Sequence, residues 1–522
     1  MKLTRKLLTS ICGFGLIALT GCDLLKGASI DMIKNAPDYT NKEGEFMTFG
    51  YTPPTNGKWY ENGLEMSTGE DYRTVERYRE YKEAGLNVLM LQSEDAYDYG
   101  TPFEESQLKI RMDDAQRAGL EKVIVCDNRL YNLCNSDQPV VGDEGVILTI
   151  NGKDFQGGIR QFKTQKALNE YVADIIDDYY NHDVFYGVLL RDEPFHQHLL
   201  NYGYTYQAVK AFDNNIYIEG NLNPYNSDEK ARFRYSPYWE TQTSEEAYKW
   251  YVNYYLDCSG AEKVLMDSYP ILGESNAPYL KEDHLRGCQM IADICKQRGV
   301  KFEAVAQTFG GTSSGKRLWA APDVATMQWQ MNTYMGFGVQ TFGYFTYWRK
   351  VWNNNQAGGE WFNDGESFIT TDGQKTSLYY IMQGLHKEMQ KFAPVISSFK
   401  YSASKTYAHE PCLYPTNYLN IKDEKLALVK DFECDQGDTA LITELKDKSN
   451  MQYMYMVMNA MNPRYKADDN DIVMDYSIDF GPSFNAVEVY YRGKRNLYPL
   501  DNGVYKSTLD AGYAEYIMPY KA

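Results

Sequence analysis

Strand-like and helix-like segments alternate along most of this chain. Eight short apolar segments are rich in β-branched and aromatic residues, the pattern of strands buried on both faces. They span residues 46–52, 86–92, 122–128, 184–192, 216–222, 264–269, 301–307 and 339–348. Most of them precede a helix-like segment, and helix-ending glycines recur at Gly85, Gly119 and Gly299. Eight such units are the number that a (β/α)8 barrel requires, so the sequence predicts an α/β fold of this type.

An open doubly wound sheet is the competing architecture. Such sheets gather their polar residues at one switch point, and many carry a Gly-x-Gly-x-x-Gly turn after the first strand. This chain has no such turn, and polar residues follow nearly every predicted strand. Both observations favour the barrel.

The pattern changes near Phe392, where short, partly alternating segments separated by Gly, Asn and Asp begin. This pattern is typical of an antiparallel β-sandwich. We therefore expect a barrel domain over residues 44–395 and a C-terminal β-sandwich over residues 396–522.

The N-terminus has the features of an export signal. Lys2, Arg5 and Lys6 precede a short apolar run that ends in Leu-Thr-Gly-Cys at Cys22. This ending resembles a bacterial lipobox, so residues 1–22 are expected to be a signal peptide with Cys22 as the lipidated residue, and residues 23–43 a tether. An ordinary signal peptide is the alternative. The lipobox predicts a protein outside the cytoplasm, anchored to a bacterial membrane at the cell surface or in the periplasm.

Composition restricts the partners. A formal charge of −18 argues against nucleic acid. Nine cysteines at irregular spacing form neither a disulfide framework nor a zinc motif, and the His196-x-His198 pair has no identifiable third ligand. We predict no cofactor and no metal, and the sequence does not indicate an oligomeric state.

The fourth predicted strand ends in two adjacent carboxylates, Asp192 and Glu193, followed by Pro194. Carboxylates at the end of a buried strand are costly to desolvate, and a barrel draws its reactive residues from such positions. They therefore form a candidate catalytic pair. The alternative is a structural salt bridge with Arg191.

Amide, carboxylate and aromatic side chains follow the later strands, and these groups suit the binding of polyhydroxylated rings. The predicted contacts are Asp192, Asn221, Asn223, Tyr225, Tyr269, Gln307, Tyr347 and Trp348. Among them, Trp348 is expected to form a platform under a sugar ring, and Asn223 and Gln307 to recognise hydroxyls. The expected partner is a carbohydrate.

Four short motifs occur in the order of the strands: RDEP at 191–194, NLNPY at 221–225, MDSYP at 266–270 and YFTYW at 344–348. Together they resemble clan A glycoside hydrolases, in particular β-galactosidase-type barrels, and little-characterised bacterial barrel proteins with a C-terminal β-sandwich. The resemblance implies that Glu193 is the general acid, a role that needs a carboxyl pKa raised by burial.

The chain departs from that family at the seventh strand, where Gln307 stands in the place of the nucleophilic glutamate. Glu303 points to the same side of the strand as Gln307, but it lies nearer the amino end, far from the mouth. The best alternative partner is Asp267 on the sixth strand, and Glu366 is a further candidate. Because strands four and six are not adjacent, Glu193 and Asp267 would suit the wider separation of an inverting enzyme.

Two functional hypotheses follow. The first is a glycoside hydrolase that uses Glu193 and Asp267. The second, motivated by Gln307, is a surface glycan-binding lipoprotein that has kept the cleft and lost hydrolysis.

Overall fold

The computed structural model describes residues 39, 42–61, 64–92, 95–97, 100–274, 277–313, 316–349, 352–354, 359–361, 367–412, 415–449, 451–464 and 472–521. The signal peptide, Cys22, most of the tether and Glu366 lie outside the described residues. No helix within the described part of the chain is long and apolar enough to cross a bilayer.

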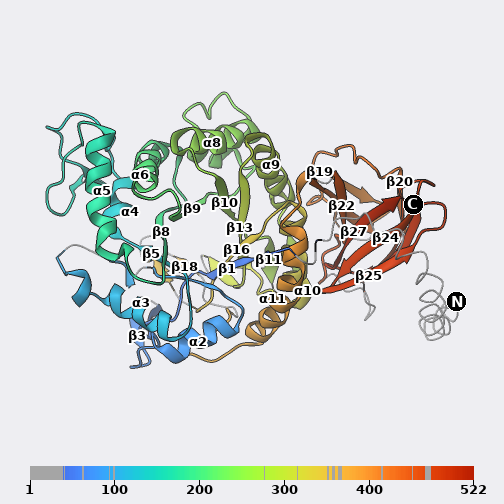
Figure 1. Ribbon diagram of the computed structural model, residues 1–522, viewed down its shortest axis with the longest axis horizontal. Coiled ribbons are helices and arrows are strands. Elements are labelled where there is room, and N and C mark those ends of the chain that lie inside the picture. Colours follow the sequence, from blue (N-terminus) through green and yellow to red (C-terminus); the bar gives the residue numbers. More distant parts are fainter. Residues whose placement is uncertain are drawn as a thin grey trace.

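A closed barrel of eight parallel strands forms the larger part of the molecule (Figure 1). The strands are β1 (Met47–Gly50), β4 (Val88–Met90), β5 (Val123–Cys126), β8 (Phe185–Asp192), β9 (Tyr217–Leu222), β10 (Lys263–Asp267), β13 (Lys301–Gln307) and β16 (Thr341–Phe345). Their spatial order is β1-β16-β13-β10-β9-β8-β5-β4. Each strand overlaps one of the eight predicted segments, so the predicted barrel is confirmed.

Helices surround the barrel. They are α2 (Val75–Glu83), α3 (Gln107–Arg117), α4 (Asn128–Cys134), α5 (Gln165–Tyr180), α6 (Leu199–Phe212), α7 (Arg232–Tyr235), α8 (Ser244–Ser259), α9 (Asp283–Arg298), α10 (Val324–Gly336) and α11 (Ser377–Ile396). Local sequence sets their ends. The α8 helix begins at a capping box formed by Thr243 and Glu246, and it ends at Gly260 in the left-handed conformation.

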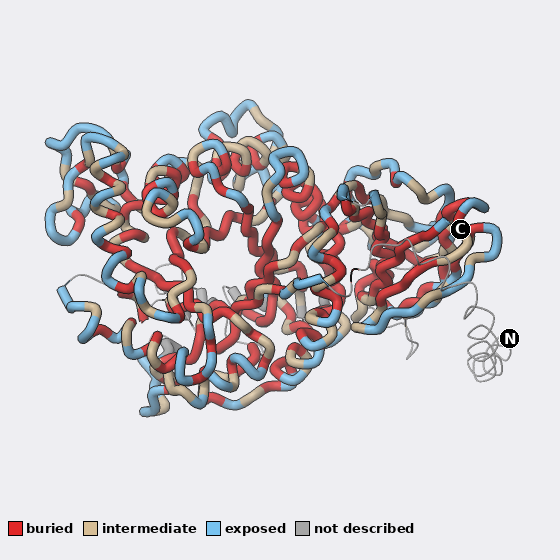
Figure 2. Tube along the Cα trace, in the orientation of Figure 1, coloured by how far each residue is buried: buried red, intermediate tan, exposed pale blue. Residues whose placement is uncertain are grey.

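Buried residues run along the strands of the barrel domain and the inner sides of its helices (Figure 2), and their apolar side chains form two layers. Phe49, Val88, Ile124, Leu265 and Val305 point inward and form the barrel interior. Residues of the opposite parity join the much larger cluster between strands and helices. This alternation explains why the strand segments are mostly apolar, since a strand in such a barrel has no face in water.

Loops at the carboxyl ends of the strands carry small sheets. The loops after β10 and β13 combine into a four-stranded sheet of β12 (Ala277–Leu280), β11 (Ile271–Glu274), β15 (Lys316–Trp319) and β14 (Gly311–Ser313). Three hairpins are β2 (Lys58–Glu61) with β3 (Leu64–Ser67), β6 (Thr149–Ile150) with β7 (Lys153–Asp154), and β17 (Trp352–Asn354) with β18 (Gly359–Trp361).

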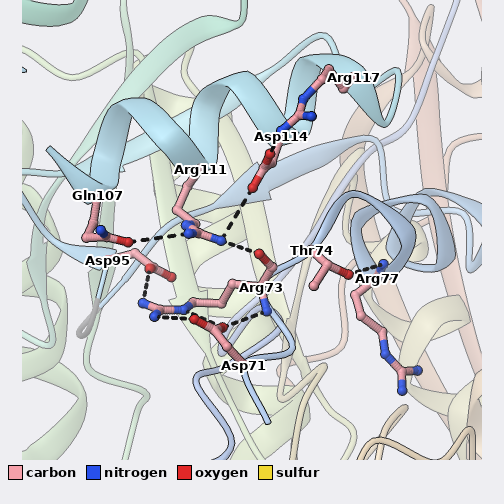
Figure 3. Close-up of polar contacts among 9 residues, drawn as sticks. All are labelled: Asp71, Arg73, Thr74, Arg77, Asp95, Gln107, Arg111, Asp114 and Arg117. Carbon is pink, nitrogen blue, oxygen red and sulfur yellow. Dashed lines mark hydrogen bonds and ion pairs between the residues drawn. The ribbon is translucent and has the colours of Figure 1, made fainter. Parts of the chain in front are cut away.

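A network of charged groups fixes the rim beside β4 (Figure 3). Arg73, just before α2, pairs with Asp71 at 2.7 Å and with Asp95, after β4, at 2.8 Å. Arg111 of α3 donates to the backbone carbonyl of Arg73 and pairs with Asp114 at 3.4 Å. The network ties the loops after β1 and β4 to one helix.

The C-terminal part is a β-sandwich, as predicted. A six-stranded antiparallel sheet has the order β19-β21-β22-β27-β24-β25, and a three-stranded sheet the order β20-β23-β26. The strands are β19 (Lys400–Ala408), β20 (Asp431–Cys434), β21 (Thr439–Asp447), β22 (Gln452–Asn459), β23 (Val473–Asp479), β24 (Phe484–Tyr491), β25 (Lys494–Pro499), β26 (Val504–Asp510) and β27 (Ala514–Lys521). Helix α11 ends at Ile396 and β19 begins at Lys400.

The sandwich is bonded directly to the barrel domain. The Trp329 indole N–H donates to the Ala460 carbonyl at 3.2 Å, and the Gln289 amide donates to Ser404 Oγ at 2.9 Å. Because both helix side chains are buried, these contacts make the seam part of the protein core.

Candidate active site

The carboxylates predicted at the end of the fourth barrel strand lie at a sharp turn. Asp192 is the last residue of β8, and Glu193 follows with a φ of +44°. The Glu193 N–H donates to the Asn221 carbonyl at 2.8 Å. A left-handed conformation is costly for a glutamate, by about 1 to 3 kcal/mol, and such strain clusters at functional sites.

Asn221 links three neighbouring strands. It lies opposite Asp192 on β8 and Leu265 on β10. Its Nδ2 donates to Asp192 Oδ1 at 3.0 Å, and its side chain also hydrogen-bonds Asp267. The structure therefore gathers Asp192, Glu193 and Asp267 around one amide at the barrel mouth.

The three carboxyl groups hold their protons more tightly than usual. Burial raises the pKa of Glu193 well above its ordinary value, and Asp267 and then Asp192 raise it further. Burial, followed by the charge of Asp192, raises the pKa of Asp267 to about 7. Burial also raises the pKa of Asp192, against the opposing effect of its hydrogen bond from Asn221. Such a cluster titrates as a unit and can keep an acid protonated at neutral pH.

Cations limit these shifts. The charge of Lys281, which follows β12, lowers the pKa of Asp267, and Arg234 of α7 lowers that of Glu193. Burial lowers the pKa of Lys281 itself. Neither cation was among the predicted site residues, because each reaches the mouth from a loop region and not from a strand end.

Several buried polar atoms at the mouth lack a hydrogen-bond partner among the described residues. They are Asp267 Oδ1, Asn221 Oδ1, Asn223 Oδ1 and Glu219 Oε2. Buried polar atoms are normally satisfied, so a group of four requires an explanation. Hydroxyl groups of a ligand would supply the missing donors.

Glu219 is a site residue that the sequence reasoning missed. It lies inside the barrel one layer below Asn221 and accepts a short hydrogen bond from the Tyr51 hydroxyl. Burial raises the pKa of Glu219 to about 8. The signal was present in the sequence, since residues 217, 219 and 221 alternate along β9 and share the inward face.

Asn223 and Tyr225 support the turn around Glu193. The Asn223 amide donates to the Pro194 carbonyl at 3.0 Å, which leaves its oxygen for a ligand. Tyr225 is buried and packs on Tyr248, with ring centroids 5.4 Å apart.

The aromatic residues after the eighth strand differ from expectation. Trp348 is only 1% exposed and packs on Tyr72, with ring centroids 4.9 Å apart, so it does not form an open platform. Tyr347 is equally buried, against Tyr81. Phe345 of β16 is the residue of this region that points into the barrel. Its ring centroid lies 5.6 Å from that of Tyr269. Tyr269 also interacts electrostatically with Asp267 and Glu193.

Gln307 has a structural role at the end of β13. Its Nε2 donates to the carbonyls of Ile271 and Ala320 at 3.1 and 3.0 Å, and its Oε1 accepts from the Ile271 N–H at 2.9 Å. It is completely buried. The amide thus fastens the four-stranded loop sheet to the barrel, and we leave Gln307 out of the ligand contacts.

The predicted histidines lie beside the turn. His198 Nδ1 accepts from the Phe195 N–H at 3.1 Å, and His196 packs against Trp250. Among the described residues no group of three or more His, Cys, Asp or Glu side chains could hold a metal ion.

No family model matches the sequence, and no curated protein matches it. Glycoside hydrolases are among the solved structures that resemble this one. A family 5 glycoside hydrolase from Bacteroides vulgatus has a TM-score of 0.48 and 10% identity, covering 91% of this chain and 89% of that one. An Anoxybacillus α-amylase has a TM-score of 0.46 and 11% identity, covering 93% and 99%.

A β-galactosidase from a psychrophilic Marinomonas has a TM-score of 0.41 and 11% identity, covering 67% of this chain. The present chain spans 60% of the length of that protein. The expected barrel is confirmed by the strand order of this protein itself. Similarity of this degree does not assign a reaction, which has to be argued from the site itself.

Replacing Asp267 by Asn is expected to change how stability depends on pH. An unfolded aspartate titrates near 4 and the folded Asp267 near 7, so between these values only the folded protein keeps the proton. The free energy of unfolding therefore falls as the pH rises from about 4 through 7. Asp267→Asn removes this loss and should stabilise the protein by on the order of 2 to 4 kcal/mol at pH 8.

Urea denaturation at pH 5 and pH 8 measures this effect. The exposed variant Asp228→Asn serves as the control. Equal pH dependence in the wild type and Asp267→Asn would contradict the raised pKa.

Proposed function

We propose that this protein is a glycoside hydrolase, with Glu193 as general acid and Asp267 as the second catalytic carboxylate. The observation that carries the proposal is a group of three carboxyls, Asp267 buried and Asp192 and Glu193 half-buried, at the carboxyl ends of β8 and β10, where a barrel places its reactive residues. Paired carboxyls in different environments are the machinery of glycoside hydrolysis.

The different surroundings of Glu193 and Asp267 favour different catalytic roles. Glu193 has its pKa raised by burial and by two neighbouring carboxyls, so it can donate a proton to the leaving glycosidic oxygen. Asp267 has Lys281, Tyr269 and Asn221 to favour its ionised form, so it can accept a proton from water. Asp192, held by Asn221, and the free oxygen of Asn223 would bind sugar hydroxyls.

We propose an inverting reaction. β9 lies between β8 and β10, which puts the two strands about 9 to 10 Å apart. Carboxyls that come from strands so far apart favour the wider separation of an inverting pair, which leaves room for a water molecule, whereas a retaining pair is closer. Proton NMR of the first product formed tests this, because inversion gives the opposite anomer and retention the same one.

The experiment that tests the function is a screen of the purified protein against aryl glycosides and plant and host glycans, with reducing sugar as the readout. Release of sugar by the wild type, and its loss in Asp267→Asn, is expected. Absence of any product with all substrates would contradict the proposal.

A glycan-binding protein without hydrolysis is the second candidate. It is favoured by Gln307, whose amide occupies the end of β13 and leaves no carboxylate there. Binding of a glycan by the wild type without product over long incubation would establish this function in place of the first.

We also propose that Cys22 is lipidated and anchors the protein outside the cytoplasm, on the strength of the lipobox-like Leu-Thr-Gly-Cys ending. Incorporation of a labelled fatty acid into the wild type is expected, with none in Cys22→Ser. Equal labelling of both proteins would contradict the anchor.

A further inference from the structure

A cavity of about 270 Å³ lies at the end of the barrel opposite the carboxyl groups. Its walls come from the segments that precede β13 and β16 and from β19 and β21 of the sandwich. It therefore opens at the seam between the two domains, below the amino ends of the barrel strands.

Lysines dominate the charge of this cavity. Lys296, Lys301, Lys400, Lys446 and Lys448 line it, in a protein whose formal charge is −18. Lys296 pairs with Asp293 at 3.5 Å and Glu424 at 3.6 Å. The other four make no ion pair with any residue that the structure describes.

The carboxylate that lines the cavity is already engaged. Glu303 accepts from Lys263 at 2.8 Å and from the Tyr217 hydroxyl at 2.7 Å, both inside the barrel. It is 4% exposed. Glu303 therefore does not neutralise the lysines of the cavity.

Strand register adds a second observation. Lys400 of β19 lies directly opposite Lys446 of β21, and Lys448 lies in the turn just after β21. Like charges directly opposite each other destabilise a strand pair. An anion held between them would turn this repulsion into attraction.

The first residues that the structure describes lie next to the cavity. Lys42 donates to Ser398 Oγ at 2.9 Å, and Tyr39 contacts Phe399 with ring centroids 5.0 Å apart. Phe399 is itself part of the cavity wall. A tether that leads to a membrane would thus leave the domain beside these lysines.

We propose that this cavity binds a phosphate group through Lys301, Lys400, Lys446 and Lys448. A multivalent oxyanion can accept hydrogen bonds from several ammonium groups at once, and lysine is a common phosphate ligand. The group can belong to a free phosphorylated molecule or to a lipid headgroup. The site is separate from the carboxyl cluster and does not depend on the proposed hydrolysis.

Titration with inorganic phosphate, followed by calorimetry at constant ionic strength, tests the site. Saturable binding at one site per chain is expected. The double variant Lys400→Gln/Lys446→Gln should weaken binding about tenfold or more, since it removes two charge-assisted contacts. Lys494→Gln, on the far edge strand β25, is the matched control and should bind as the wild type does.

A second measurement separates the two sources of phosphate. Co-sedimentation compares vesicles of phosphatidylcholine with and without phosphatidylglycerol. A preference for phosphatidylglycerol in the wild type, lost in the double variant, identifies a lipid headgroup. Phosphate binding without that preference identifies a free anion.

Stability without phosphate provides an independent check. The double variant should then be at least as stable as the wild type, because it relieves the repulsion across β19 and β21. Absence of saturable phosphate binding together with equal vesicle binding by the wild type and the double variant would overturn the proposal.

Discussion

Replacement of Glu193 by glutamine is expected to lower kcat by about 10²- to 10⁴-fold, the usual contribution of a general acid. Glutamine keeps the size of the side chain and removes the proton that the leaving group needs. Its effect on the fold should be small or favourable, because it also removes a carboxyl from a site where Asp192 and Asp267 already oppose ionisation. Kinetics with an aryl glycoside, and thermal denaturation of the same samples, measure the two effects.

The leaving group distinguishes acid catalysis from a merely structural role. A dinitrophenyl glycoside needs no protonation when its bond breaks, so Glu193→Gln should lose far less activity on it than on an alkyl glycoside. Glu229→Gln is a suitable control, since Glu229 is exposed and pairs with Arg232 of the same surface segment, at 3.5 Å. Equal losses on both substrates would refute the assignment of Glu193 as the acid.

Replacement of Lys263 by methionine is expected to destabilise the protein by about 3 to 5 kcal/mol. The Lys263–Glu303 pair lies at the amino end of the barrel interior, with side chains only 11% and 5% exposed. The substitution keeps the length of the side chain and leaves Glu303 buried with its charge uncompensated. Chemical denaturation at pH 7 measures the loss.

The double variant Lys263→Met/Glu303→Leu is the informative companion. Removing both charges leaves no buried ion, so much of the lost stability should return. A double variant as unstable as the single one would show that packing, and not the unpaired charge, causes the loss.

The barrel could be predicted because its strands have a recognisable apolar pattern in the sequence. A strand buried on both faces is mostly apolar, and polar residues follow nearly every one of the eight strands at the mouth. The segment 301–307 was predicted with the ends that β13 has in the structure. The sandwich followed from alternation along short segments separated by turn residues.

The site was harder to predict because strand parity decides which way a side chain points. Trp348 looked suitable as a platform, but it lies three residues beyond β16 and packs on the outside, whereas Phe345 faces inward. The place of Gln307 at a strand end suggested a contact with a ligand hydroxyl. Its amide instead bonds loops that come together only in the folded chain. Lys281 reaches Asp267 through the same loops. Long loop connections of this kind leave no periodic signal in sequence.

The inward face of β9 places polar side chains at successive levels along the barrel axis. Tyr217, Glu219 and Asn221 follow one another at alternate positions, and they connect the Glu303 pair at the floor to the carboxyls at the rim. Asp192 from above and Glu303 from below both raise the pKa of Glu219, whereas Lys263 lowers it. The charges at the two ends of the barrel interior therefore both influence the protonation of Glu219. A substitution at the floor of the barrel can shift the pH optimum of the mouth without touching a bound ligand.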